Sequence, residues 1–62
     1  MEREIQQEID GIVNEVVELR YRRDEGEDRV ERAMRAAGLG GDYEAMKEGL
    51  RYYEQQCDSK GL

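Results

Sequence analysis

The segment IQQEIDGIVNEVVEL, residues 5–19, decides the fold of this chain. Apolar side chains recur in it at intervals of four, three, four and three residues. This heptad spacing is typical of a helix that packs along its whole length against another helix. The apolar stripe consists of Ile5, Ile9, Ile12, Val16 and Leu19. Val13 and Val17 widen it, which indicates contact with more than one helix.

A second, shorter stripe follows in the last third of the chain. It consists of Tyr43, Met46, Leu50, Tyr53 and Cys57. We expect Tyr43 and Tyr53 to face the core with their hydroxyl groups at its rim. Cys57 follows the apolar rhythm and precedes an acid, so we interpret it as a buried structural thiol.

Turn and capping residues divide the chain into predicted helices at residues 2–23, 26–37 and 42–57. Gly38 is a favourable stop signal, because glycine enters the left-handed conformation at a helix end without strain. Asp42 is a suitable N-cap for the last helix. Gly11 lies beside the first stripe, where it marks either a close helix crossing or a tolerated defect.

The segment from residue 20 to residue 28 allows two interpretations. Asp24 and Glu27 have the spacing of a capping box, which favours a break at residues 24–26. Charged pairs four residues apart, such as Glu25 with Arg29, favour one continuous helix instead. A break would let three helices close into a small bundle, whereas a continuous helix would need a second chain to cover its N-terminal half.

The fold class is therefore all-α: a helical hairpin or small three-helix arrangement with coiled-coil-like packing. A chain of 62 residues is marginally stable alone, and a single cysteine allows no internal disulfide. We therefore predict a homo-oligomeric bundle, whose interface is the stripe of Ile5, Ile9, Ile12, Val16 and Leu19. We expect one domain, residues 1–58, followed by a frayed tail at 59–62.

Composition restricts the possible functions. The chain has sixteen acidic and ten basic residues, a formal net charge of −6 and no histidine. An acidic protein repels nucleic acid as a whole. No apolar run is long enough to span a membrane, and the N-terminus does not resemble an export signal. We therefore expect a cytoplasmic protein that binds neither nucleic acid nor membranes.

No motif indicates catalysis, a cofactor or a metal. Residues 24–28 do not match a calcium loop, because Gly26 occupies a position that needs an oxygen ligand. The glycines at 38–41 lack the lysine and hydroxyl residue of a phosphate-binding loop. We predict no catalytic, cofactor-binding or metal-binding residues, and no enzymatic activity.

Two functional hypotheses remain. The first is a small interaction module that oligomerises and binds or regulates a larger protein, with Arg51 and Tyr52 as contact residues, because tyrosine and arginine are enriched at binding hot spots. The alternative is an acidic inhibitor of the viral or mobile-element type, which mimics nucleic-acid charge to block an enzyme. It is supported by acids that share one side of the first helix: Glu4, Glu8, Glu15 and Glu18.

Overall fold

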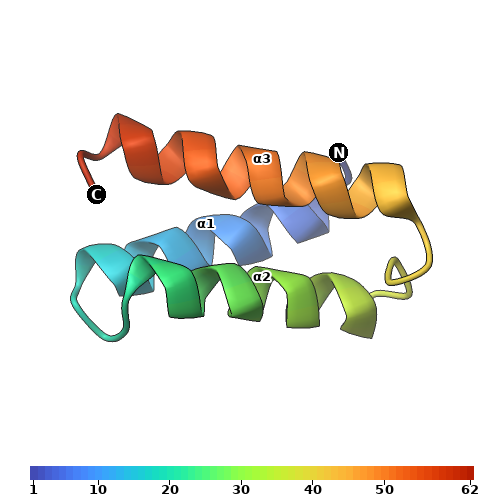
Figure 1. Ribbon diagram of the computed structural model, residues 1–62, viewed down its shortest axis with the longest axis horizontal. Helices are drawn as coiled ribbons and strands as arrows, with labels where there is room; N and C mark the ends of the chain where they lie inside the picture. The colour runs from blue at the N-terminus through green and yellow to red at the C-terminus, as the bar shows by residue number, and fades with distance from the viewer.

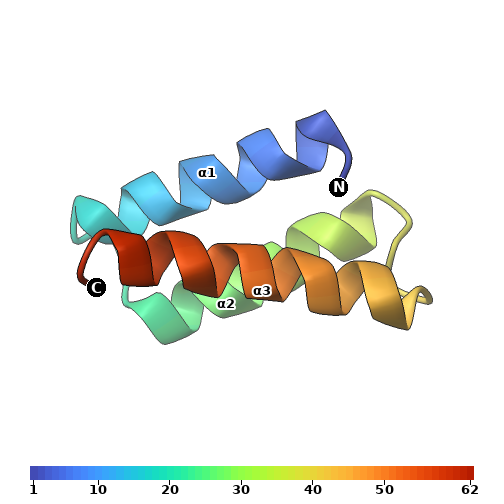
Figure 2. The same ribbon diagram turned by 90° about the horizontal axis from the view of Figure 1, so that it is seen from above.

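The computed structural model describes residues 1–62 and contains three α-helices joined by two short connections. They are α1 (Arg3–Val17), α2 (Arg23–Ala36) and α3 (Tyr43–Ser59). The chain runs along α1, returns along α2 and reverses again into α3 (Figures 1 and 2). Each helix packs against the other two. The all-α prediction is confirmed, in its three-helix form.

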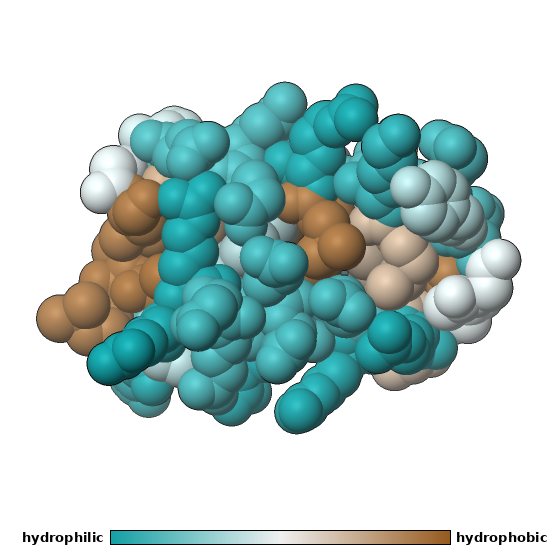
Figure 3. Space-filling view, in the orientation of Figure 1, coloured by the Kyte–Doolittle hydropathy of each residue, from teal (hydrophilic) through white to brown (hydrophobic).

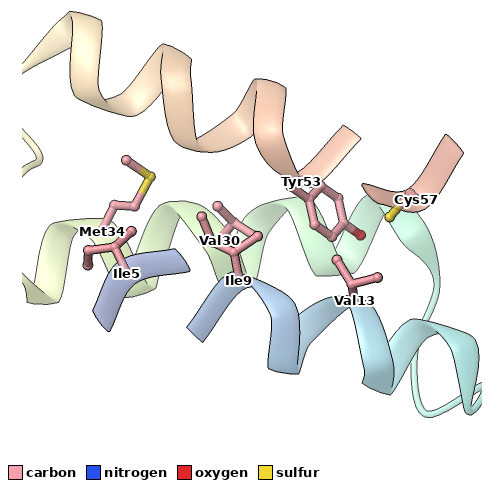
Figure 4. Close-up of a cluster of buried hydrophobic side chains, with 7 residues drawn as sticks. All are labelled: Ile5, Ile9, Val13, Val30, Met34, Tyr53 and Cys57. Atoms are coloured by element: carbon pink, nitrogen blue, oxygen red, sulfur yellow. The ribbon is translucent and has the colours of Figure 1, made fainter. Parts of the chain in front are cut away.

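The core lies between the three helices and draws side chains from each of them (Figure 4). Ile5, Ile9 and Val13 come from α1, Val30 and Met34 from α2, and Tyr53 and Cys57 from α3. Cys57 is buried, as predicted. The prediction that Tyr43 faces the core was wrong, because this residue is 73% exposed at the start of α3.

The stripe predicted as an oligomer interface is largely covered within one chain. Ile5, Ile9 and Val16 are buried, Ile12 is half-buried, and Leu19 is 88% exposed beyond the end of α1. Val13, and not Ile12, is the fully buried residue in the middle of α1. This difference arises because a helix packed against two others needs a wider apolar face than a helix packed against one. Burial of the stripe therefore does not require a second copy, and oligomerisation stays a prediction.

The break between the first two helices was predicted at the wrong place. Helix α2 runs without interruption through residues 24–26, and the chain turns at residues 18–22 instead. Asp24 does not cap the helix, because it lies inside the first turn of α2. This earlier turn leaves α2 long enough to pack along α1.

The second connection follows the sequence prediction. Gly38 takes a φ of +82°, and the Asp42 side chain accepts a hydrogen bond from Ala45 N at 3.0 Å. The predicted domain boundary at residue 58 and the frayed tail at residues 59–62 stay predictions. Helix α3 extends to Ser59, and Leu62 N donates to the carbonyl oxygen of Cys57 at 3.0 Å.

Two glycines allow the helices to approach closely. A Cβ atom at Gly26 would overlap the hydroxyl oxygen of Tyr53 and lie 3.0 Å from Val16 Cγ2. A Cβ atom at Gly49 would overlap Met34 Sδ. Gly11, in contrast, has no atom near its Cβ position, so it is a tolerated defect and marks no helix crossing.

Candidate interaction surface

An apolar patch covers the end of the bundle where α1 turns into α2 and the chain terminates. Figure 3 shows hydrophobic residues gathered at this end, on the left in the orientation of Figure 1. A shallow depression of about 340 Å³ lies there, lined by Val16, Leu19, Tyr21, Arg22, Arg23 and Leu62. We call these residues the Leu19 end.

Leu19 combines exposure with an unfavourable backbone conformation. It is the only non-glycine residue with a positive φ, at +61°. Leu19 N bonds to Val16 O and Arg20 N to Glu15 O, so the end of α1 is a Schellman motif with Leu19 in the left-handed position. The same motif ends α2 and α3, where glycines occupy that position: Gly38 and Gly61.

Replacing Leu19 by glycine should therefore stabilise the fold. The left-handed conformation is unfavourable for residues with a Cβ atom, and Leu19 contributes little buried area because it is 88% exposed. Glycine loses more chain entropy on folding, which offsets part of the gain. We expect the free energy of unfolding to rise by about 1 kcal/mol in urea titrations. An unchanged or lower value would show that Leu19 is not strained.

The two arginines of the Leu19 end differ in their partners. Arg23 donates to Glu54 Oε2 at 2.7 Å, to Asp58 Oδ1 at 2.8 Å and to the carbonyl oxygen of Leu62. The hydrogen bonds that Arg23 donates to Asp58 and Glu54 raise the pKa of Arg23 and hold it in its charged form. Arg22 is exposed and has no ion-pair partner. It is therefore free to meet an acid on another molecule.

Tyr21 lies at the edge of the same end. The Arg29 guanidinium stacks over its ring at 4.3 Å from the ring centre, and this guanidinium is bonded to Glu25 at 3.0 Å. Burial raises the pKa of Tyr21, although the charge of Arg29 opposes this effect. The ring is thus held in place beside Leu19, while part of it remains accessible.

The contact residues predicted on the last helix have different environments. The hydroxyl of Tyr52 donates to Asp10 Oδ1 at 2.5 Å, and this hydrogen bond raises the pKa of Tyr52. Tyr52 is half-buried and joins α3 to α1, so its polar group already has an internal partner. Arg51 is exposed and makes no ion pair. A partner contact at Arg51 and Tyr52 stays a prediction.

Exposed acids occur on all three helices and not on a single face. They include Glu4 and Glu8 on α1, Asp24, Glu25 and Asp28 on α2, and Glu44, Glu48 and Asp58 on α3. Of the four acids predicted to share one side of the first helix, two lie close to a basic side chain: Arg20 is 4.0 Å from both Glu15 and Glu18. No group of three or more histidine, cysteine or acidic residues is placed to hold a metal ion.

One pair of acids faces each other between α2 and α3. Glu54 Oε1 is buried without a hydrogen-bond partner, while Glu54 Oε2 binds Arg23. Burial raises the pKa of Glu27, and the neighbouring carboxylates of Glu54, Glu31 and Asp28 raise it further. The protonated form of Glu27 could donate the hydrogen bond that Glu54 Oε1 lacks.

A glutamine at position 27 should therefore stabilise the fold at pH 7. Because the folded chain holds a proton on Glu27 more tightly than the unfolded chain, wild-type stability should rise as the pH falls from 7 towards 5. We expect Glu27→Gln to gain roughly 0.5 kcal/mol at pH 7 and to reduce this pH dependence. Urea unfolding at both pH values tests this, with Glu8→Gln as the control on the open side of α1.

Equal effects of the Glu27 and Glu8 substitutions would contradict a specific interaction of Glu27. A loss of stability in Glu27→Gln would show that the charged carboxylate is the favoured form. Either result would show that Glu27 does not donate a hydrogen bond to the buried Glu54 Oε1.

No helix of the structure combines the length and apolar character needed to cross a lipid bilayer. No family model, curated protein or solved structure matches the chain.

Proposed function

We propose that the chain is a small helical protein-interaction module that self-associates and docks on a larger protein, which it binds or regulates without catalysis. The single observation that carries this proposal is the state of Leu19. Its side chain is 88% exposed, and its backbone is left-handed. The left-handed backbone destabilises a small isolated domain and the exposed side chain adds almost no buried area, whereas a binding anchor needs an exposed apolar side chain.

The residues around Leu19 support binding to a protein. Tyrosine, arginine and large apolar side chains dominate the energetics of protein interfaces, and the Leu19 end offers Tyr21, Arg22 and Leu62 beside Leu19. Arg22 could pair with a carboxylate at the rim of an apolar pocket on the partner. The proposed partner is therefore a protein with an apolar recess and a nearby acid.

Nucleic acid is a poorer partner for this chain. Contacts to phosphate groups need arginine or lysine side chains that are not already paired with acidic side chains. Arg23, Arg29 and Arg35 are each bonded to acids of the chain, at 2.7, 3.0 and 3.2 Å. The overall charge of −6 adds repulsion.

Site-specific photo-crosslinking in cells of the native host tests the proposal. Benzoylphenylalanine replaces Tyr21 in one variant and Tyr43 in a matched control. Both positions carry a tyrosine beside a cation, but they lie at opposite ends of the bundle. We expect a larger host protein to crosslink from position 21 and not from position 43. Equal crosslinking from both positions, or none from position 21, would overturn the proposal.

The alternative is an acidic inhibitor that presents carboxylates where an enzyme binds phosphates. Its support is the exposed pair Glu4 and Glu8, which form no ion pair and lie next to the open surface at Gly11. The spread of exposed acids over all three helices makes this proposal weaker than the first. If these acids form the contact with the partner, replacing Glu4 and Glu8 together by glutamine should abolish partner capture. If the Leu19 end forms the contact, the same double substitution should leave capture unchanged.

A further inference from the structure

We infer that Glu27 forms a proton-controlled latch between α2 and α3, which keeps the C-terminal part of α3 closed over Cys57 while Glu27 carries a proton. When this proton leaves for solvent, the Glu27 carboxylate repels Glu54 and competes with it for Arg23. The contact between the two helices then loosens at this end. The inference is independent of the proposed function, because it concerns how the chain closes on itself and needs no partner.

Arg23 holds the C-terminal part of α3 against α2. Its guanidinium donates to Glu54 Oε2 at 2.7 Å, to Asp58 Oδ1 at 2.8 Å and to the carbonyl oxygen of Leu62. Its own carbonyl oxygen accepts a hydrogen bond from the Tyr53 hydroxyl at 2.7 Å. Every side-chain hydrogen bond between α2 and the C-terminal end of the chain therefore involves Arg23. A competitor for this guanidinium weakens the attachment of the whole end.

Glu27 is placed to be that competitor. It follows Arg23 by four residues in α2, the spacing at which an acid and an arginine pair along one helix. In the structure Arg23 bonds across to α3 instead, and the Glu27 and Glu54 carboxyl groups lie within hydrogen-bonding reach of each other. Glu54 Oε1 is buried and has no donor, whereas Oε2 is bound by Arg23. A protonated Glu27 supplies the missing donor, and an ionised Glu27 leaves two carboxylates in contact.

The surroundings of Glu27 favour its protonated form. Burial raises its pKa, and the carboxylates of Glu54 on α3 and of Glu31 and Asp28 on α2 raise it further. The nearby guanidinium of Arg23 is engaged by Glu54 at 2.7 Å. All buried residues of α1 are apolar, so this helix adds no buried charge. Because folding raises the pKa of Glu27, the latch is closed in acid and opens as the pH rises through the pKa of the folded chain.

Cys57 provides a natural reporter of this opening. Its side chain is fully buried one turn after Tyr53, on the face of α3 that packs on the core (Figure 4). A thiol reagent such as dithiodipyridine reaches it only when the end of α3 moves away or the whole chain unfolds. Protection of Cys57 is the labelling rate of the urea-unfolded chain divided by that of the folded chain at the same pH. This ratio removes the effect of pH on the thiol itself.

Labelling of the purified chain at pH 5 and pH 7 tests the inference. We expect protection of Cys57 in the wild type to fall about two- to threefold from the lower to the higher pH, as is typical of a partly exposed charge interaction. Glu27→Gln keeps a donor for Glu54 at both pH values and should remove this fall. Glu25→Gln is the matched control in the same helix, because Glu25 bonds to Arg29 and not to α3. It should keep the wild-type fall.

Two further readouts separate the latch from general destabilisation. In carbon NMR, the Glu27 carboxyl should titrate above the range of an ordinary glutamate, and the Glu54 signal should move at the same pH. Protection of Cys57 at pH 7 should also be lower than that of the Ile9 amide in α1, since one end opens more easily than the whole chain unfolds.

Equal protection of Cys57 at both pH values in the wild type would overturn the inference, and so would an unchanged fall in Glu27→Gln. Titration of Glu27 in the ordinary range would exclude the shared proton. Equal protection of Cys57 and the Ile9 amide would show that the thiol is reached only by unfolding of the whole chain, which would remove the latch.

Discussion

Replacing Tyr53 by alanine is expected to unfold the chain at room temperature. The Tyr53 side chain is fully buried between the three helices, and its hydroxyl donates to the carbonyl oxygen of Arg23 at 2.7 Å. Truncation of a buried aromatic side chain costs about 3–5 kcal/mol, which is comparable to the whole stability of a domain this small. Far-UV circular dichroism should show most of the helical signal lost.

Tyr43→Ala is the matched control on the same helix. Tyr43 is 73% exposed, so its removal should change the free energy of unfolding by no more than about 0.5 kcal/mol. If Tyr53→Ala retained full helicity and a cooperative urea transition, Tyr53 would not be the centre of the core.

The same substitution at two glycines should have opposite effects. Gly26→Ala places a methyl group against the Tyr53 hydroxyl and Val16, and Tyr53 cannot yield without losing its bond to Arg23. We expect a net loss of about 1–3 kcal/mol. Gly11→Ala meets no atom and should gain about 1 kcal/mol through helix propensity. Urea unfolding of both variants under identical conditions measures the difference.

Two results would contradict this account of the glycines. Stabilisation by Gly26→Ala would show that α2 and α3 do not approach each other at Gly26. Destabilisation by Gly11→Ala would show that Gly11 faces a neighbouring element, as a helix crossing would require.

Local signals in the sequence were sufficient for much of the fold. The apolar rhythm of residues 5–16 predicted α1 and its two-sided packing, since hydrophobic periodicity directly reports a helix face. Gly38 and Asp42 predicted the second connection because each satisfies a specific backbone requirement. These signals depend on residues close together in the sequence.

The first connection was misplaced for the same reason. Its left-handed position is occupied by Leu19, which gives no turn signal, and the apolar rhythm continues through it. Gly26 gives no sign in the sequence of a close helix approach, although it admits the Tyr53 hydroxyl. This requirement depends on a residue of α3, so only the three-dimensional arrangement reveals it.

The candidate site was only partly predictable. Leu19 was included among the interface residues as the last member of a stripe, whereas its exposure results from the turn that removes it from the stripe. Tyr52 was predicted as a partner contact because tyrosine is enriched at binding hot spots. Its hydrogen bond to Asp10 depends on the packing of α3 beside α1, which a one-dimensional pattern does not specify.

The central claim is that Leu19 serves binding and opposes stability. The most direct test is capture of the host protein by Leu19→Gly, a variant that should unfold at higher urea concentration than the wild type. We predict that this more stable variant loses the partner, since it keeps the fold and removes only the exposed anchor. Capture equal to that of the wild type by a fully folded Leu19→Gly would contradict the claim.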